Sequence, residues 1–176
     1  MAAGDIAAAW QRRAAVLRRR PDTGLSDDAP ATARWDGGTR VVTAHANGTR
    51  LETDMPKEMG GSGDRVSPGW LLRASLASCL ATRISLAAAA EGIELGALEV
   101  RVGSRSDTRG LLGMADANGE AVSAGPRDMQ LRVLIAAPGV SDQRLQALVE
   151  DSHRCSPTAC AVRDAVPVAL HIEIGA

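Results

Sequence analysis

The sequence predicts an α+β fold in which helices cover a mainly antiparallel sheet, with one long buried helix at the centre and a second helix later in the chain. The central helix is expected from a long apolar run that begins at Ser67. Strands are expected where apolar and polar residues alternate, and a helix where apolar residues recur every three or four positions. These patterns give the order β-β-β-α-β-β-α-β after an N-terminal helix, with strands within 31–55, 97–107, 128–139 and 166–174 and the second helix over 141–155.

The central helix has clear start and stop signals, and we expect it to be buried on nearly every side. Ser67 can cap its N-terminus, Pro68 fits the first helical position, and Gly92 can end it in a left-handed conformation. Arg73 and Arg83 interrupt the run, so it lacks the roughly eighteen uncharged residues of a membrane span. We therefore interpret it as a core helix.

The strands before this helix form a predicted meander with tight turns at 36–38 and 46–48. A glycine-rich loop, 56–69, then leads into the helix. This loop lacks the lysine and the spacing of a phosphate-binding loop, so we interpret it as an adaptable loop near a site. Near the end of the chain, Val168, Leu170, Ile172 and Ile174 share one face of a predicted closing strand.

The N-terminal region, residues 1–29, is predicted to be an amphipathic helix followed by a polar linker, with the main domain at 30–176. An apolar stripe runs along the helix, and Pro21 ends it. The region lacks the apolar core of a secretory signal. We expect the helix to pack on the domain or on a second subunit. The stripe consists of Ile6, Trp10, Ala14 and Leu17.

Composition limits the classes of function. The net charge is −1, and the aromatic residues are three Trp without Phe or Tyr, which argues against nucleic acid or an anionic membrane as a partner. Three cysteines are few and odd in number, which favours a reducing, cytoplasmic setting in which any disulfide is transient. Cys155, Cys160 and His153 lie close in sequence but lack a second ligand pair, so no metal site is predicted.

Cysteine spacing suggests a redox site. Ser75, Cys79 and Arg83 follow each other at i, i+4 on the central helix, and a nearby guanidinium favours the reactive thiolate. Cys79 and Cys155 lie on separate helical segments that can meet in space. From spacing alone, two inert core cysteines remain the alternative.

The sequence resembles the OsmC/Ohr family, the osmotically inducible and organic hydroperoxide resistance proteins, over about 31–174. The resemblance implies an intertwined homodimer with two active sites at the subunit interface, and an organic hydroperoxide as the substrate. It rests on the segments PKEMGG, SPGWLLRASLASCLA, EGIELGALEVRV, SDTRGLLGM and CSPTACAVRDAVPVAL.

The same resemblance implies residue roles. Cys79 takes the place of the peroxidatic thiolate and Cys155 that of the resolving thiol, while Cys160 stands where the family often has Asp. The peroxide oxidises the first thiol to a sulfenic acid, which condenses with the second to a disulfide that a dithiol reductant restores. An arginine from the first strands holds the peroxide, and Arg40 is the best match, with Arg34 as a register alternative. No cofactor or metal is implied.

One position departs from the family pattern. Enzyme members usually carry a glutamate directly after the helix-opening proline, where it orients the arginine, but this chain has Gly69. Glu58 in the preceding loop is the candidate substitute. Loss of the orienting carboxylate supports a second hypothesis, a dimeric small-molecule binding or sensing protein whose peroxide chemistry is weakened.

Overall fold

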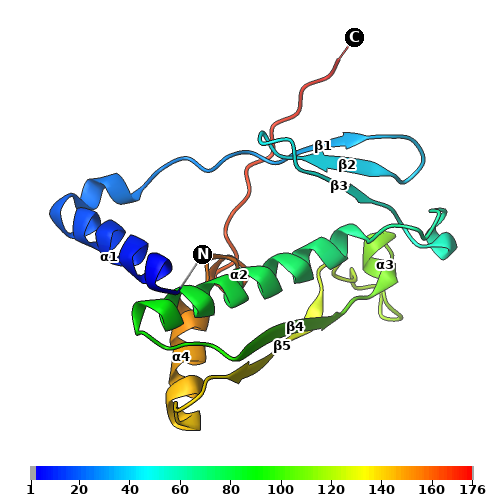
Figure 1. Ribbon diagram of the computed structural model, residues 1–176. Helices are drawn as coiled ribbons and strands as arrows, with labels where there is room; N and C mark the ends of the chain where they lie inside the picture. The colour runs from blue at the N-terminus through cyan, green and yellow to red at the C-terminus, as the bar shows by residue number, and fades with distance from the viewer. Residues whose placement is uncertain (1–2, 176) are drawn as a thin grey trace.

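A computed structural model describes residues 3–175 and confirms the α+β class, with helices packed on antiparallel strands (Figure 1). The strands form two separate sheets, one of three strands and one of two. In chain order the elements are α1 (Ala3–Arg19), η1 (Pro21–Gly24), β1 (Thr32–Trp35), β2 (Val41–Ala44), β3 (Arg50–Thr53), η2 (Lys57–Met59), α2 (Pro68–Ala90), β4 (Ala97–Arg105), α3 (Thr108–Leu111), β5 (Arg127–Ala136), α4 (Asp142–Arg154) and α5 (Pro157–Arg163).

The first sheet is the predicted meander β1-β2-β3, with Thr32 opposite Ala44 and Val41 opposite Thr53. Its two turns contain Gly37 at φ 97° and Gly48 at φ 90°, a region that residues with a Cβ rarely adopt. Both turns lie where the sequence predicts them.

The second sheet pairs β4 with β5, and its inner face covers α2. Alternate residues of both strands, such as Val100 and its partner Val133, point toward the helix. Removing this apolar area from water is the main stabilising contribution of this part of the fold. The core that they cover consists of Leu80, Ile84, Ala87, Ala88 and Leu148.

Helix α2 begins and ends where the sequence predicts. The Ser67 hydroxyl accepts a hydrogen bond from the N–H of Trp70, and Gly92 adopts φ 70° just beyond the C-terminus. By length and composition α2 could also cross a membrane, but β4, α4 and α1 pack against it. Leu80 and Ile84 are inaccessible, and three consecutive residues near the C-terminus, 87–89, are buried, so the expected burial on nearly every side is found there. Along the rest of the helix a stripe is exposed, consisting of Leu72, Ser75, Ser78 and Thr82.

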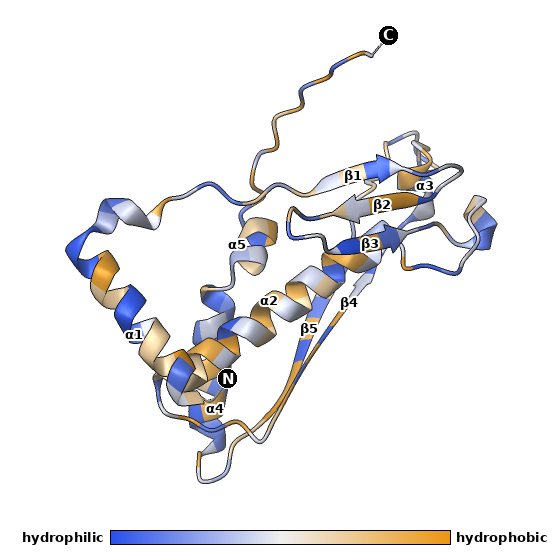
Figure 2. Ribbon diagram, turned by 45° about the horizontal axis from the view of Figure 1, so that its top comes forward, coloured by the Kyte–Doolittle hydropathy of each residue, from blue (hydrophilic) through white to orange (hydrophobic). Residues whose placement is uncertain are grey.

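The predicted N-terminal helix is present as α1, and it packs against α2. Figure 2 shows its N-terminal part beside the C-terminal part of α2, at the same end of the molecule as α4. The division of the chain between residues 29 and 30 stays a prediction.

The predicted closing strand is wrong for the single chain. Beyond α5, residues 165–175 run as an extended coil away from the rest of the molecule (Figure 1). A strand needs a neighbour to pair its backbone groups, and no strand of the described chain lies beside this segment. Its apolar face is consequently exposed: Val168 91%, Leu170 82%, Ile172 74% and Ile174 93%.

Candidate functional site

The structure brings Cys79 and Cys155 to one pocket of about 350 Å³. Cys79 lies on α2, and Cys155 is the residue that ends α4. The pocket combines a mostly apolar surface with a few hydroxyl and thiol groups, an arrangement that suits a small organic ligand. Its lining residues are Trp10, Ser78, Cys79, Thr82, Arg83, Leu86, Cys155 and Pro157.

The turn between α4 and α5 places a hydroxyl on the Cys79 thiol. Ser156 stands at the N-cap position of α5, but its hydroxyl does not cap that helix. It instead donates a hydrogen bond to the Cys79 sulfur at 3.3 Å. Ser156 is fully buried, so water cannot compete for this bond. Pro157 opens the short helix α5.

These contacts favour the thiolate of Cys79. Burial raises the pKa of the thiol, but hydrogen bonds from the Ser156 hydroxyl and from the N–H and hydroxyl of Thr158 outweigh it, so the net pKa is lowered. The Thr158 hydroxyl is itself buried without a hydrogen bond of ordinary geometry, so we assign the stronger effect to Ser156. A lowered pKa increases the nucleophilic fraction of the thiol at neutral pH.

The predicted cation beside Cys79 is present, but it plays a different part. Arg83 lines the pocket, and its guanidinium carbon lies 5.0 Å from the centre of the Trp10 ring. Arg83 is not among the causes that lower the Cys79 pKa, which are hydroxyl and N–H groups. No sequence pattern indicates that Trp10 lines this pocket, because its position depends on how α1 docks.

Arg40 lies elsewhere, in a polar network at the start of β2. Its guanidinium donates to Ser62 at 3.0 Å and to Asp64 at 2.8 Å, and it lies 3.5 Å from a carboxylate oxygen of Asp54. Arg40 does not line the cysteine pocket. Within one chain, therefore, the structure does not bring this predicted peroxide-binding residue to Cys79.

Buried Asp54 organises the glycine-rich loop. It accepts hydrogen bonds from the Thr39 hydroxyl, the Met55 N–H and both the N–H and hydroxyl of Ser62, which hold its pKa well below the usual range. Gly61 is required here, since a Cβ would come within 1.8 Å of the Met55 carbonyl oxygen. The N–H of Ser62 in this loop donates to the Asp54 carboxylate. This N–H is therefore not free to bind a phosphate, in line with the expectation from the sequence.

Glu58 and Cys160 also lie outside the cysteine pocket. Glu58 is exposed in η2. The Cys160 thiol donates a hydrogen bond to the carbonyl oxygen of Arg154 at 3.2 Å, within the turn between α4 and α5. Within residues 3–175, no group of three or more His, Cys, Asp or Glu side chains could hold a metal ion.

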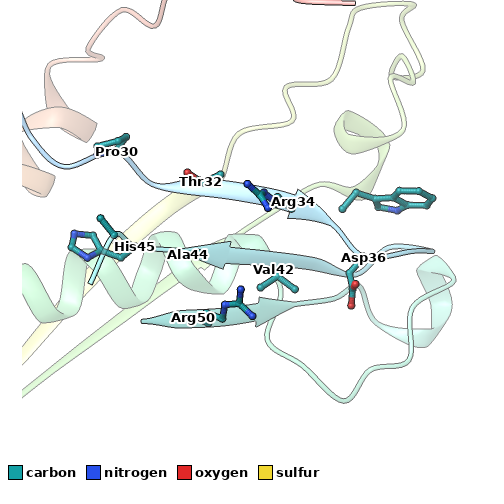
Figure 3. Close-up of a pocket in the computed structure, with 10 residues that line it drawn as sticks. Pro30, Thr32, Arg34, Asp36, Val42, Ala44, His45 and Arg50 are labelled. Carbon is teal, nitrogen blue, oxygen red and sulfur yellow. The ribbon is translucent and has the colours of Figure 1, made fainter. Parts of the chain in front are cut away.

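A second cavity, of about 510 Å³, lies on the three-stranded sheet (Figure 3). Arg34, the alternative candidate for the peroxide-binding arginine, lines this cavity and not the cysteine pocket. Thr32, Val42 and Ala44 share the same sheet face with it. The cavity is thus an uncovered sheet surface, separate from the cysteines.

Comparison with known proteins gives consistent results. A sequence profile of the OsmC-like proteins matches residues 61–171, and no curated protein matches. An OsmC-like protein from Mycoplasma pneumoniae superposes with a TM-score of 0.65 and 18% identity, over 79% of this chain and 89% of that chain. An organic hydroperoxide resistance protein from Elizabethkingia anophelis gives 0.57 and 23%, over 80% and 91%. An OsmC-like protein of unknown function from Vibrio cholerae gives 0.62 and 14%, over 77% and 94%.

Proposed function

Because the chain belongs to the OsmC-like protein family, we propose that it is a thiol-dependent peroxidase that reduces organic hydroperoxides through Cys79 and Cys155. The observation that carries the proposal is the shared pocket of these two cysteines, in which Ser156 and Thr158 favour the thiolate of Cys79. Proteins of the same fold are named organic hydroperoxide resistance proteins, which fits a peroxide as substrate.

In the proposed reaction the Cys79 thiolate attacks the distal oxygen of the hydroperoxide. The S–O bond forms as the O–O bond breaks, and the electron pair leaves with the alkoxide, which takes a proton to become an alcohol. Cys79 is then a sulfenic acid. The Cys155 thiolate attacks its sulfur, water leaves, and a disulfide forms. A dithiol reductant returns both thiols by exchange.

We further propose that the working unit is an intertwined homodimer. The segment 165–175 exposes an apolar face and pairs with no strand of the described chain, so a second copy would cover it. If Arg40 binds the peroxide, it must do so across this interface, because it lies outside the pocket of its own chain.

Turnover of cumene hydroperoxide by the purified protein with a dithiol reductant tests the proposed activity. We expect saturable consumption that Cys79→Ser abolishes and that Cys160→Ser leaves intact, since Cys160 lies outside the pocket. Wild-type turnover no faster than that of Cys79→Ser would contradict the proposal.

The second candidate function is a binding or sensing protein on the same scaffold. It is favoured by Gly69, which removes the family's orienting glutamate, and by the acidic residues that already hold Arg40. It predicts a saturable change in the protein on binding an apolar ligand, with no oxidation of Cys79. The turnover measurement therefore separates the two functions.

A further inference from the structure

Arg83 has an unused hydrogen-bond donor beside the proposed reaction centre. It follows Cys79 by one helical turn, and both line the same pocket. Its Nη1 atom is buried and has no hydrogen-bond partner in the part of the chain that the structure describes. A buried guanidinium N–H without an acceptor is costly, so this atom favours a ligand that supplies one.

Arg83 is also the only cationic side chain among the described residues that line this pocket. The other lining residues that carry polar side-chain groups offer hydroxyl, thiol and indole groups. The lowered pKa of Cys79 is explained by other residues, Ser156 and Thr158, so Arg83 is not needed to form the thiolate. Its charge is therefore available for a group that becomes negative during the reaction.

We propose that Arg83 is a catalytic residue that donates a hydrogen bond to the alkoxide oxygen leaving the substrate, and that Trp10 positions it. The inference rests on the proposed peroxidase function. As the Cys79 sulfur takes the distal oxygen, negative charge develops on the other peroxide oxygen, which is the atom that Arg83 would stabilise. A proton from solvent then converts the alkoxide to the alcohol that leaves.

Trp10 supports this role through the face of its ring. A guanidinium within about 6 Å of an indole centre is held by cation–π attraction, and the observed 5.0 Å falls inside that range. Trp10 is 37% exposed on α1, so its ring borders both the solvent and the pocket that contains Cys79. The N-terminal helix thereby becomes part of the active site.

The test compares two arginines of the same helix, Arg83→Met and Arg73→Met. Arg73 bonds Ser104 and does not line the pocket, so it controls for loss of an arginine from α2. Oxidation of Cys79 by cumene hydroperoxide is followed in a single turnover by quenching and intact mass. We expect Arg83→Met to slow it on the order of a hundredfold, as for loss of one donor to a developing oxyanion. Arg73→Met should match the wild type.

Alkylation of Cys79 by iodoacetamide is the second readout, because it needs the thiolate but involves no peroxide. We expect its rate and pH profile to be unchanged in Arg83→Met. Trp10→Ala should slow oxidation without changing alkylation, and Trp10→Phe should keep most of the wild-type rate, since it retains an aromatic face. A structural defect would instead affect both readouts and would not be rescued by Phe.

The possible outcomes are distinct. If the wild type oxidises Cys79 and Arg83→Met does so equally fast, this inference is wrong while the peroxidase proposal stands. If Arg83→Met slows alkylation as much as oxidation, Arg83 acts on the thiol and the inference is again wrong. If wild-type Cys79 is not oxidised at all, both proposals fail.

Discussion

At the scale of single residues, neutral hydrogen-bond donors favour the thiolate of the proposed nucleophile. The Cys79 thiol is partly buried, which alone would disfavour its charged form. Ser156, which donates to the sulfur from a buried position instead of capping its own helix, and Thr158 together outweigh that effect. The sequence predicted a guanidinium as the cause, because Arg83 stands at i+4, whereas the structure identifies neutral donors.

A first prediction concerns Ser156→Ala. Loss of the donor should raise the pKa of Cys79, so that less thiolate is present and alkylation near neutral pH is slower. The pH profile of alkylation measures this pKa, and in the wild type it should lie below the free-thiol value of about 8.5.

The matched control is Ser152→Ala. Ser152 is equally buried, but its hydroxyl has no hydrogen-bond partner within the described chain, so its removal should leave the profile unchanged. A Ser156→Ala profile that coincides with the wild type would show that this hydroxyl does not stabilise the thiolate.

At the scale of elements, features that depend on neighbouring residues were predicted correctly, whereas contacts between distant segments were not. The caps of α2, the turns of the first sheet and the strand at β4 are written in nearby residues, and each was found as expected. The closing strand failed because residues 165–175 pair with no strand of the described chain. The family resemblance predicted that the two cysteines act together, and they line one pocket, but no local pattern predicted that Trp10 joins them, because none says where α1 docks.

Helix α2 also permits a test of its departure from the family. An added Cβ at Gly69 meets only the side chains of Arg73 and Ser67, at 3.8 and 3.9 Å, so a larger residue fits. Gly69→Glu should stabilise the protein by on the order of 1 kcal/mol, by reducing backbone freedom and by placing a negative charge in the first helical turn.

Thermal unfolding measures this effect, and Gly69→Ala separates the backbone contribution from the charge. Glu should exceed Ala, and the excess should shrink at high salt. A lower melting temperature for Gly69→Glu than for the wild type would mean that the start of α2 is constrained by something that these contacts do not include.

At the scale of the whole molecule, the single chain leaves apolar surface that folded proteins seldom expose. The segment 165–175 has an alternating apolar face without a partner strand, and Leu111, Leu112 and Met114 are 57%, 58% and 50% exposed near α3. Both features favour a second copy of the chain as the cover.

The prediction at this scale is a dimer at micromolar concentration by sedimentation. Ile172→Asp introduces a charge on the apolar face of the segment and should yield monomer or unfolded chain, while His171→Asp, one residue away on the opposite face of the alternation, should remain dimeric. A stable, folded wild-type monomer would contradict the intertwined arrangement.

The central claim is that Cys79 and Cys155 form a peroxide-reducing pair, and mapping of disulfides after oxidation tests it most directly. The reduced protein is treated with cumene hydroperoxide in slight deficit, free thiols are blocked, and peptides are identified by mass spectrometry. The account predicts a Cys79–Cys155 disulfide in the wild type and a trapped sulfenic acid on Cys79 in Cys155→Ser. An unmodified Cys79, or a Cys79–Cys160 disulfide in its place, would contradict it.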